Sequence, residues 1–172
     1  MGLNIALELR SRYPDSSIAV VDKESTLAAH GSGRNSGVLH AGFYYTRDSL
    51  KARFCRDGNR ALTEFCLEYG LPLRRCGKLV AAAGERELSG LDTLLARGRE
   101  NGIPVEMIDE NQAREIEPGI KTCGRALWSP TTSTVDPGRV VAALADVARK
   151  KNISLWLGNP YLGRKAGGIA TA

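Results

Sequence analysis

The beginning of the sequence combines a helix that starts at a glycine with a short apolar strand that ends at an acid. Apolar residues at helical spacing follow Gly2 and Pro14 closes the run, so residues 2–13 predict a helix. Residues 17–21 are largely apolar and predict a buried strand, which ends at Asp22, 20 residues after Gly2. This spacing is typical of the second half of a dinucleotide-binding βαβ unit, in which the acid binds a ribose hydroxyl.

Only part of the glycine fingerprint of such a unit is present. The first strand and the first two glycines of the G-x-G-x-x-G pattern are absent from the sequence. Gly2 therefore corresponds to the third glycine, which allows a helix to pack closely on a strand. We expect the chain to be a fragment of a longer protein, and we expect the 172 residues alone to bind a dinucleotide weakly or not at all.

A glycine-rich segment over residues 30–45 contains both histidines of the chain, His30 and His40. Such a composition favours a backbone that approaches a bulky polar ligand, although it is also common in surface turns. The preceding strand and acid favour the ligand interpretation. The glycines of the segment are Gly31, Gly33, Gly37 and Gly42.

From Gly2 to about Leu157 the sequence resembles the amino-terminal part of the L-2-hydroxyglutarate dehydrogenase/oxidase family, within the D-amino-acid-oxidase-like, FAD-dependent superfamily. Residues 30–45 are the most specific part of the resemblance. They depart from the family in having Gly31-Ser32-Gly33 where Gln-Thr-Gly is usual, and in having Arg34 before Asn35. The other segments that carry the resemblance are residues 18–24, 49–52, 76–79 and 134–136.

The resemblance implies FAD as the cofactor. Asp22 would hold the ribose, Gly2 would permit close approach at the start of the helix, and Asn35, Ser36 and Gly37 would contact the pyrophosphate or the flavin. The full set of expected cofactor-binding residues is Gly2, Asp22, Lys23, Gly33, Asn35, Ser36 and Gly37.

The resemblance also implies oxidation of L-2-hydroxyglutarate to 2-oxoglutarate, with oxygen or a quinone as electron acceptor. A base that works near neutral pH is typically an imidazole, so His40 is the candidate base or hydrogen-bond partner. A structural role stays open for His40, and His30 is expected to order its loop. Tyr44, Tyr45 and Lys78 are candidate substrate residues, with buried core tyrosines and an edge-strand lysine as the alternatives.

Two other functional classes stay open. The first is an FAD-dependent amino-acid, amine or glycerol-3-phosphate oxidoreductase of the same superfamily. The second is a non-catalytic remnant without a cofactor. A panel of substrates that reduce the flavin without oxygen would separate these classes.

The order of elements predicts an α/β fold. The resemblance implies that this fold is a partial FAD-binding Rossmann-like domain, which lacks its first strand and is interrupted by an α+β substrate domain. The first part of the FAD-binding domain would span residues 1–73, the substrate domain 74–133 and the continuation 134–172.

Apolar spacing and turn residues predict the individual elements. Asp109 with Gln112, and Asp136 with Pro137, are typical helix starts. Residues 129–134 predict a loop, and the glycine-rich tail beyond Asn159 is expected to be poorly ordered. Residues 73–83 predict either a pair of strands or one long strand. Helices are expected at 48–70, 85–100, 109–117 and 136–150, and further strands at 105–108, 125–128 and 153–157. The expected buried stripe of the helix over 48–70 is Leu50, Phe54, Ala61, Leu62, Phe65, Cys66 and Tyr69.

The charge and the cysteines of the sequence limit the classes of ligand that we expect the chain to bind. The net charge of +5 comes from 24 basic and 19 acidic residues that are interspersed, so we expect anionic small molecules rather than nucleic acid as ligands. Four cysteines without C-x-x-C spacing predict reduced thiols and no metal site. No apolar run is long enough for a transmembrane segment. The expected location is the cytoplasm, with peripheral membrane contact open, or the mitochondrion in a eukaryote.

Overall fold

A computed structural model describes residues 1–165 and 167–171 of the chain, and these form two units of mixed α/β structure. The first unit joins Met1–Ser36 to Asp136–Ala172, and the second is the continuous segment Gly37–Val135. The division into functional domains at residues 73/74 and 133/134 stays a prediction. No helix among the described residues is long and apolar enough to cross a membrane.

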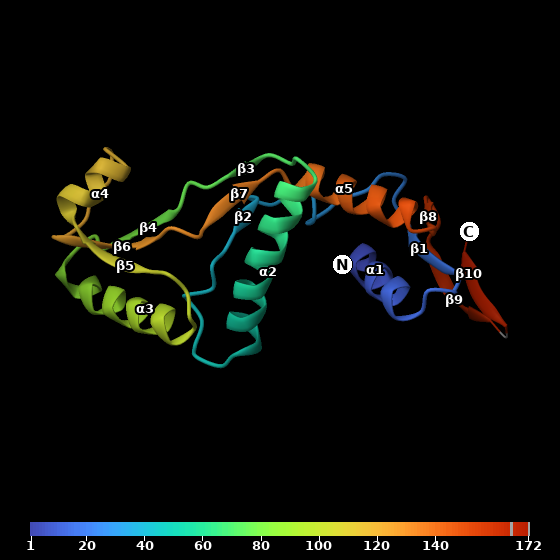
Figure 1. Ribbon diagram of the computed structural model, residues 1–172, viewed down its shortest axis with the longest axis horizontal. Coiled ribbons are helices and arrows are strands. Elements are labelled where there is room, and N and C mark those ends of the chain that lie inside the picture. The colour runs from blue at the N-terminus through green and yellow to red at the C-terminus, as the bar shows by residue number, and fades with distance from the viewer. Residues whose placement is uncertain (166, 172) are drawn as a thin grey trace. The chain divides into compact units, whose positions relative to one another are not determined.

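In the first unit two parallel strands carry two helices (Figure 1). The strands pair with Ile18 opposite Ile153 and Asp22 opposite Leu157, so the segment after the second helix joins the sheet begun by the first strand, as predicted. The four elements are α1 (Gly2–Arg12), β1 (Ile18–Asp22), α5 (Pro137–Lys150) and β8 (Ile153–Leu157).

The core of this unit lies between the two helices and the sheet. Ala145 and Ala148 of α5 are fully buried, and Ala6 of α1 is 4% exposed, so small side chains let the helices approach closely. Helix α5 begins as predicted, because Asp136 accepts a hydrogen bond from the backbone N–H of Arg139 and proline occupies the first turn.

The tail differs from the expectation of poor order. The strands β9 (Tyr161–Lys165) and β10 (Gly168–Thr171) pair in antiparallel fashion. Gly167, with φ of +84°, supplies the turn between them, and backbone hydrogen bonds form a ladder whatever the side chains are. Residues 166 and 172, which belong to the same predicted tail, lie outside the described residues.

The second unit contains two three-stranded antiparallel sheets among its described residues. One has the order β2 (Val38–Leu39), β7 (Ser133–Val135), β3 (Leu73–Arg74), and the other β4 (Lys78–Ala81), β6 (Arg125–Ser129), β5 (Glu106–Asp109). The prediction of a loop over residues 129–134 was wrong at both ends, because Ser129 still belongs to β6 and β7 begins at Ser133. Strand β2 was also missed, because two or three residues are too few to show an alternating pattern.

Three α-helices complete the second unit, and their ends follow the predicted signals. Asp109 and Gln112 form a full capping box at the start of one of them. Gly70, with φ of +61°, ends another, where the N–H of Leu71 donates to the carbonyl of Cys66 at 2.8 Å. These helices are α2 (Leu50–Glu68), α3 (Leu88–Glu100, after a 3₁₀ turn at Glu85–Glu87) and α4 (Glu110–Ile116).

The apolar stripe predicted for α2 is largely exposed. Leu50 and Phe54 are each 63% exposed and Tyr69 is 39% exposed, whereas only Ala52 and Cys66 of this helix are buried. Helical spacing identifies which residues share a face, but it does not show how much of that face a neighbouring element covers. The prediction that the whole stripe is buried was therefore wrong.

The core of the second unit is centred on Leu127, which is fully buried in the middle strand β6. Leu127→Ala is expected to lower the free energy of unfolding of this unit by about 2–5 kcal/mol, because it removes buried surface and leaves a cavity. Leu50→Ala is the matched control and should change it by less than about 0.5 kcal/mol, since Leu50 is exposed. Urea unfolding measures both, and equal losses would contradict the burial described.

Candidate functional site

A cavity of about 300 Å³ lies in the first unit where β1 ends and α1 begins. Its lining brings together residues that are far apart in the sequence, including Gly2, Asp22, His30, Ser32 and Val141. This is the carboxyl end of a parallel strand beside a helix N-terminus, the position at which doubly wound folds bind nucleotides. The arrangement suits the adenosine part of a dinucleotide.

Asp22 presents its carboxylate at this cavity. One carboxylate oxygen accepts a hydrogen bond of 3.0 Å from the N–H of Glu24, and the Asp22 carbonyl accepts one of 2.9 Å from the N–H of Asn159. Within the described residues no side chain donates to the carboxylate. It therefore remains available to accept hydrogen bonds from a pair of hydroxyl groups.

Gly2 also lines the cavity, but helix packing does not require a glycine there. A Cβ atom added at Gly2 would lie 3.5 Å from Cγ1 of Val20, an ordinary van der Waals distance. The absence of a side chain leaves space beside the first N–H groups of α1, whose first turn contains no acid. A role in close approach of a ligand stays a prediction for this residue.

Glu24 lies between two basic groups at the rim of the same cavity. Its Oε1 is 2.8 Å from Nε2 of His30 and 2.9 Å from Nζ of Lys23. Hydrogen bonds from His30 and then Lys23 lower the pKa of Glu24 to about 2, and Glu24 raises the pKa of Lys23. The ammonium of Lys23, a predicted cofactor residue, is thus paired with Glu24, and His30 fastens its loop to the end of β1.

The loop from His30 to Ser36 depends on glycine and amide groups. A Cβ at Gly33 would lie 2.3 Å from the carbonyl oxygen of Ala28, so only glycine fits at this close approach. The side-chain amide of Asn35 donates to the carbonyls of Gly31 and Ser32 at 2.9 and 3.1 Å. Gly33 and Asn35 therefore shape the loop that carries Ser32 to the cavity, while neither lines the cavity itself.

Ser36 and Gly37 lie at the junction of the two units. Ser36 is the last residue of the first segment, and Gly37 begins the second unit. Gly37 has φ of +67°, which favours glycine, and its carbonyl accepts a hydrogen bond of 2.9 Å from the N–H of Val135. Contacts of these two residues with a cofactor stay a prediction.

In the second unit the structure brings the candidate base His40 together with two candidate substrate residues, Tyr44 and Lys78. Nζ of Lys78 lies 4.6 Å from the centre of the Tyr44 ring, a cation–π contact. Partial burial and then the positive charge of Lys78 lower the pKa of His40, so its imidazole is neutral near pH 7. The neutral imidazole of His40 can accept a proton. The neighbouring ammonium of Lys78 can attract an anion.

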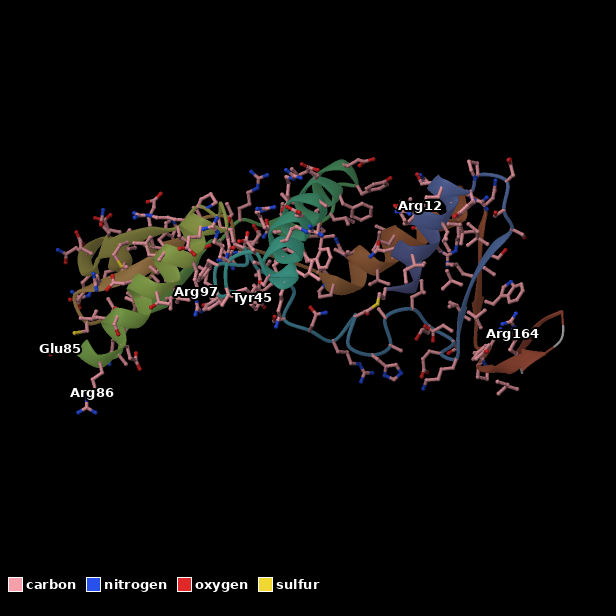
Figure 2. All side chains as sticks on the ribbon, turned by 90° about the horizontal axis from the view of Figure 1, so that it is seen from below. Arg12, Tyr45, Glu85, Arg86, Arg97 and Arg164 are labelled. Atoms are coloured by element: carbon pink, nitrogen blue, oxygen red, sulfur yellow. The ribbon has the colours of Figure 1, made fainter. Side chains whose placement is uncertain are left out.

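Tyr45 is held separately from this cluster. Nζ of Lys51 lies 4.6 Å from its ring centre, and its carbonyl accepts a hydrogen bond of 3.0 Å from the Asn101 side chain. Arg97 donates to the carbonyl of Tyr44 at 3.0 Å, and Figure 2 shows Arg97 and Tyr45 close to each other. The Tyr44 ring thus contacts Lys78 of β4, whereas the Tyr45 ring contacts Lys51 of α2.

A close glycine contact sets the position of Lys78. Gly77 has φ of +65°, and a Cβ added there would lie 1.8 Å from Cη2 of Trp128, so only glycine fits against the indole. Its N–H donates to the carbonyl of Thr132 at 2.9 Å. Lys78 begins the edge strand β4, so both its substrate role and the alternative of an edge-strand lysine remain compatible with its place.

Ser32 and Glu24 are among the residues that line the nucleotide-side cavity but were not predicted to bind the cofactor. Ser32 lies within the glycine-rich segment and was a candidate only as part of it. Glu24 was part of the resemblance but had no assigned role. Its pairing with Lys23 and His30 depends on a turn whose path no local spacing reveals.

The sequence belongs to the family of FAD-dependent oxidoreductases called DAO, which it matches over residues 1–172. One relative is the L-2-hydroxyglutarate dehydrogenase of Escherichia coli K12, which is 40% identical over 88% of this chain and 36% of that protein. Another is the mitochondrial L-2-hydroxyglutarate dehydrogenase of Nematostella vectensis, which is 39% identical over 92% of this chain and 35% of that protein. The human mitochondrial L-2-hydroxyglutarate dehydrogenase is 38% identical over 84% of this chain and 31% of that protein. The chain thus spans about a third of the length of these relatives.

Solved structures share the fold. L-α-glycerophosphate oxidase from Mycoplasma pneumoniae, with FAD bound, has a TM-score of 0.84 and 22% identity over 98% of this chain and 46% of that one. L-proline dehydrogenase from P. horikoshii has a TM-score of 0.85 and 20% identity, over 98% of this chain and 46% of that chain. The predicted α/β fold, the resemblance to the L-2-hydroxyglutarate enzymes and FAD as the cofactor of the family are therefore confirmed.

The carboxyl group of Glu24 should titrate with a pKa near 2, because hydrogen bonds from His30 and Lys23 stabilise its charged form. Since the pKa in the unfolded chain is about 4.5, the stabilisation is present above that pH and is lost as pH falls towards 2. Carbon-detected NMR of the side-chain carboxyl measures it. His30→Ala should raise the pKa, whereas His40→Ala, the control histidine, should leave it unchanged. A midpoint near 4.5 in the unaltered chain would contradict the pairing.

Gly77→Ala should destabilise the second unit by about 1–3 kcal/mol, because the added methyl group collides with the Trp128 ring at a left-handed backbone position. Displacement of Lys78 should also remove the ring-current shift that Tyr44 gives its ε-methylene protons in NMR. Gly84→Ala is the control, since nothing lies within 4 Å of its Cβ position. Equal stability of the two variants would show that the indole is not packed on Gly77.

Proposed function

We propose that this chain forms the adenosine-binding part and some of the substrate-side residues of an FAD-dependent L-2-hydroxyglutarate dehydrogenase. The observation that carries the proposal is identity of about 40% to enzymes of that name over most of the chain. Solved structures of glycine oxidase and L-proline dehydrogenase type share only 21% and 20% identity. The sequence similarity therefore favours a 2-hydroxy acid over the amino-acid, amine and glycerol-3-phosphate alternatives.

The residues of the first unit fit the adenosine part of FAD. Asp22 offers a carboxylate to a ribose diol, and the open space at Gly2 leaves the N-terminus of α1 accessible to a phosphate. The cavity is near the lower limit of about 300–1,000 Å³ for ligand pockets, which suits one nucleoside rather than a complete FAD. Asn35, Ser36 and Gly37 are proposed to continue the contacts along the cofactor.

The second unit is proposed to serve the substrate. A bound flavin would supply the two-electron acceptor for the hydrogen on the substrate α-carbon. His40, neutral at pH 7, takes the proton of the substrate hydroxyl. Lys78, held over the Tyr44 ring, attracts a substrate carboxylate, and Tyr45 lines the same side.

The electron acceptor and the compartment are further parts of the proposal. The acceptor is either oxygen or a quinone, and a quinone would bring the enzyme to a membrane surface. Relatives from Nematostella vectensis, Caenorhabditis elegans and Homo sapiens are named as mitochondrial. A eukaryotic source would place this protein in the same compartment, and a bacterial source in the cytoplasm.

A chimera tests the function, in which this chain replaces the matching 36% of the Escherichia coli K12 enzyme. L-2-hydroxyglutarate should bleach the flavin absorption band in the absence of oxygen, because only a true substrate transfers hydride. Glycine, L-proline and glycerol 3-phosphate should leave the flavin oxidised. Bleaching by one of these three but not by L-2-hydroxyglutarate would overturn the assignment.

In the same chimera, His40→Ala should slow flavin reduction by about 100-fold or more, the usual effect of losing a general base. FAD content after gel filtration should stay unchanged, because the imidazole acts on the substrate. His30→Ala is the matched control and should retain most of the rate, since His30 pairs with Glu24. Stopped-flow absorbance gives both rates, and equal rates for His40→Ala and the unaltered chimera would remove His40 from the mechanism.

A further inference from the structure

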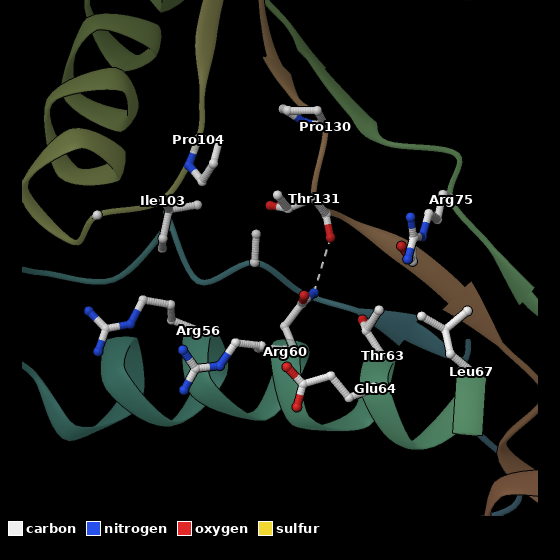
Figure 3. Close-up of a pocket in the computed structure, with 14 residues that line it drawn as sticks. Arg56, Arg60, Thr63, Glu64, Leu67, Arg75, Ile103, Pro104, Pro130 and Thr131 are labelled. Atoms are coloured by element: carbon white, nitrogen blue, oxygen red, sulfur yellow. Dashed lines mark hydrogen bonds between the residues drawn. The ribbon is translucent and has the colours of Figure 1, made fainter. Parts of the chain in front are cut away.

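A larger cavity, of about 530 Å³, lies wholly within the second unit (Figure 3). One wall is a single face of α2, on which the lining residues recur at steps of three and four. The opposite wall comes from the segment after α3 and the turn between β6 and β7. The residues of the α2 wall include Arg56, Arg60, Thr63, Glu64 and Leu67.

The lining of this cavity is positively charged. Three arginines, Arg56, Arg60 and Arg75, line it with one acid, Glu64, so three positive charges and one negative charge leave a net charge of +2. Such a balance attracts a dianion. No predicted cofactor, substrate or catalytic residue lines this cavity.

Two of the three guanidinium groups are available to a ligand. Arg56 is already used, since it donates to Asp57 at 2.9 Å and to the carbonyl of Asn101 at 3.2 Å. Within the part of the chain that the structure describes, the side chains of Arg60 and Arg75 make no hydrogen bond or ion pair. Both are solvent-exposed, so each can turn towards a ligand without breaking an existing contact.

Hydrogen bonds from one side chain of α2 hold the walls of the cavity together. The side-chain amide of Asn59 donates to the carbonyls of Leu39 at 2.9 Å and Thr131 at 3.2 Å, the second of which is the dashed line in Figure 3. These bonds fasten α2 to the strand and to the turn that face it. The cavity is therefore formed before any ligand arrives, which lowers the entropic cost of binding.

Arg60 and Arg75 lie on different sides of the cavity in Figure 3, Arg60 on α2 and Arg75 beyond β3. The cavity is also lined by the apolar residues Leu67, Ile103, Pro104 and Pro130. A hydrated inorganic ion gains little from such walls, whereas the hydrocarbon part of an organic anion gains from contact with them. A guanidinium at each side matches a carboxylate at each end.

We propose that this cavity is a second binding site of the chain, which takes a small organic dicarboxylate with one carboxylate on Arg60 and the other on Arg75. The hydroxyl of Thr63, on the same face of α2, supplies a neutral donor. The proposal does not depend on the proposed oxidoreductase function, because it uses none of the residues assigned to that function.

Titration of the purified 172-residue chain with succinate and glutarate, followed by ¹⁵N-NMR at Thr131 and Ile103, tests the site. Both dicarboxylates should shift these signals, and butyrate, with one carboxylate, should bind about fivefold or more weakly because one charged pair is missing. Higher salt should weaken binding, since both arginines are exposed. A parallel titration with inorganic phosphate distinguishes a site for carboxylates from a site for any anion, and phosphate should bind more weakly than succinate.

Arg60→Gln and Arg75→Gln should each weaken succinate binding about fivefold or more. Arg86→Gln is the charge-matched control, because Arg86, labelled in Figure 2, lies on the 3₁₀ turn at Glu85–Glu87 and does not line this cavity. Circular dichroism checks that all three variants keep the fold. Unchanged affinity in the first two variants, equal loss in Arg86→Gln, or phosphate binding as tightly as succinate would overturn the proposal.

Discussion

The parallel pairing of β1 with β8 is the constraint on which the first unit depends. It joins residues 18–22 to residues 153–157 across more than a hundred intervening positions. The chain stays paired beyond the strands, where the N–H of Gly158 donates to the carbonyl of Glu24 at 2.8 Å. This fixes the carboxyl end of β1, and with it the place where Asp22 meets the start of α1 and the loop that carries Ser32.

Interactions of a different kind organise the second unit. Cations lie over aromatic rings, Lys78 over Tyr44 and Lys51 over Tyr45, and glycine at position 77 lets the backbone lie on the Trp128 ring. Because Lys78 is held by a ring rather than by an acid, its charge remains able to lower the pKa of His40 and to attract a carboxylate. The proposed catalytic chemistry depends on this arrangement.

The sequence predicted most of the elements and the fold class, because helix caps and apolar periodicity act over a few residues. The capping box at Asp109, the start of α5 at Asp136 and the return of β8 to β1 are examples. Features that depend on contacts between distant parts of the chain could not be predicted in the same way. The exposure of Leu50 and Phe54, the short strands β2 and β7, and the pairing of Glu24 with His30 depend on neighbours that local spacing does not reveal.

The central claim is that the carboxylate at the end of β1 holds the ribose of the cofactor. A crystal structure of the FAD-loaded chimera with the Escherichia coli enzyme tests it most directly. A carboxylate oxygen of Asp22 should lie at hydrogen-bonding distance, about 2.5–3.0 Å, from a ribose hydroxyl of the adenosine. An adenosine bound elsewhere, with Asp22 facing only solvent, would contradict the account.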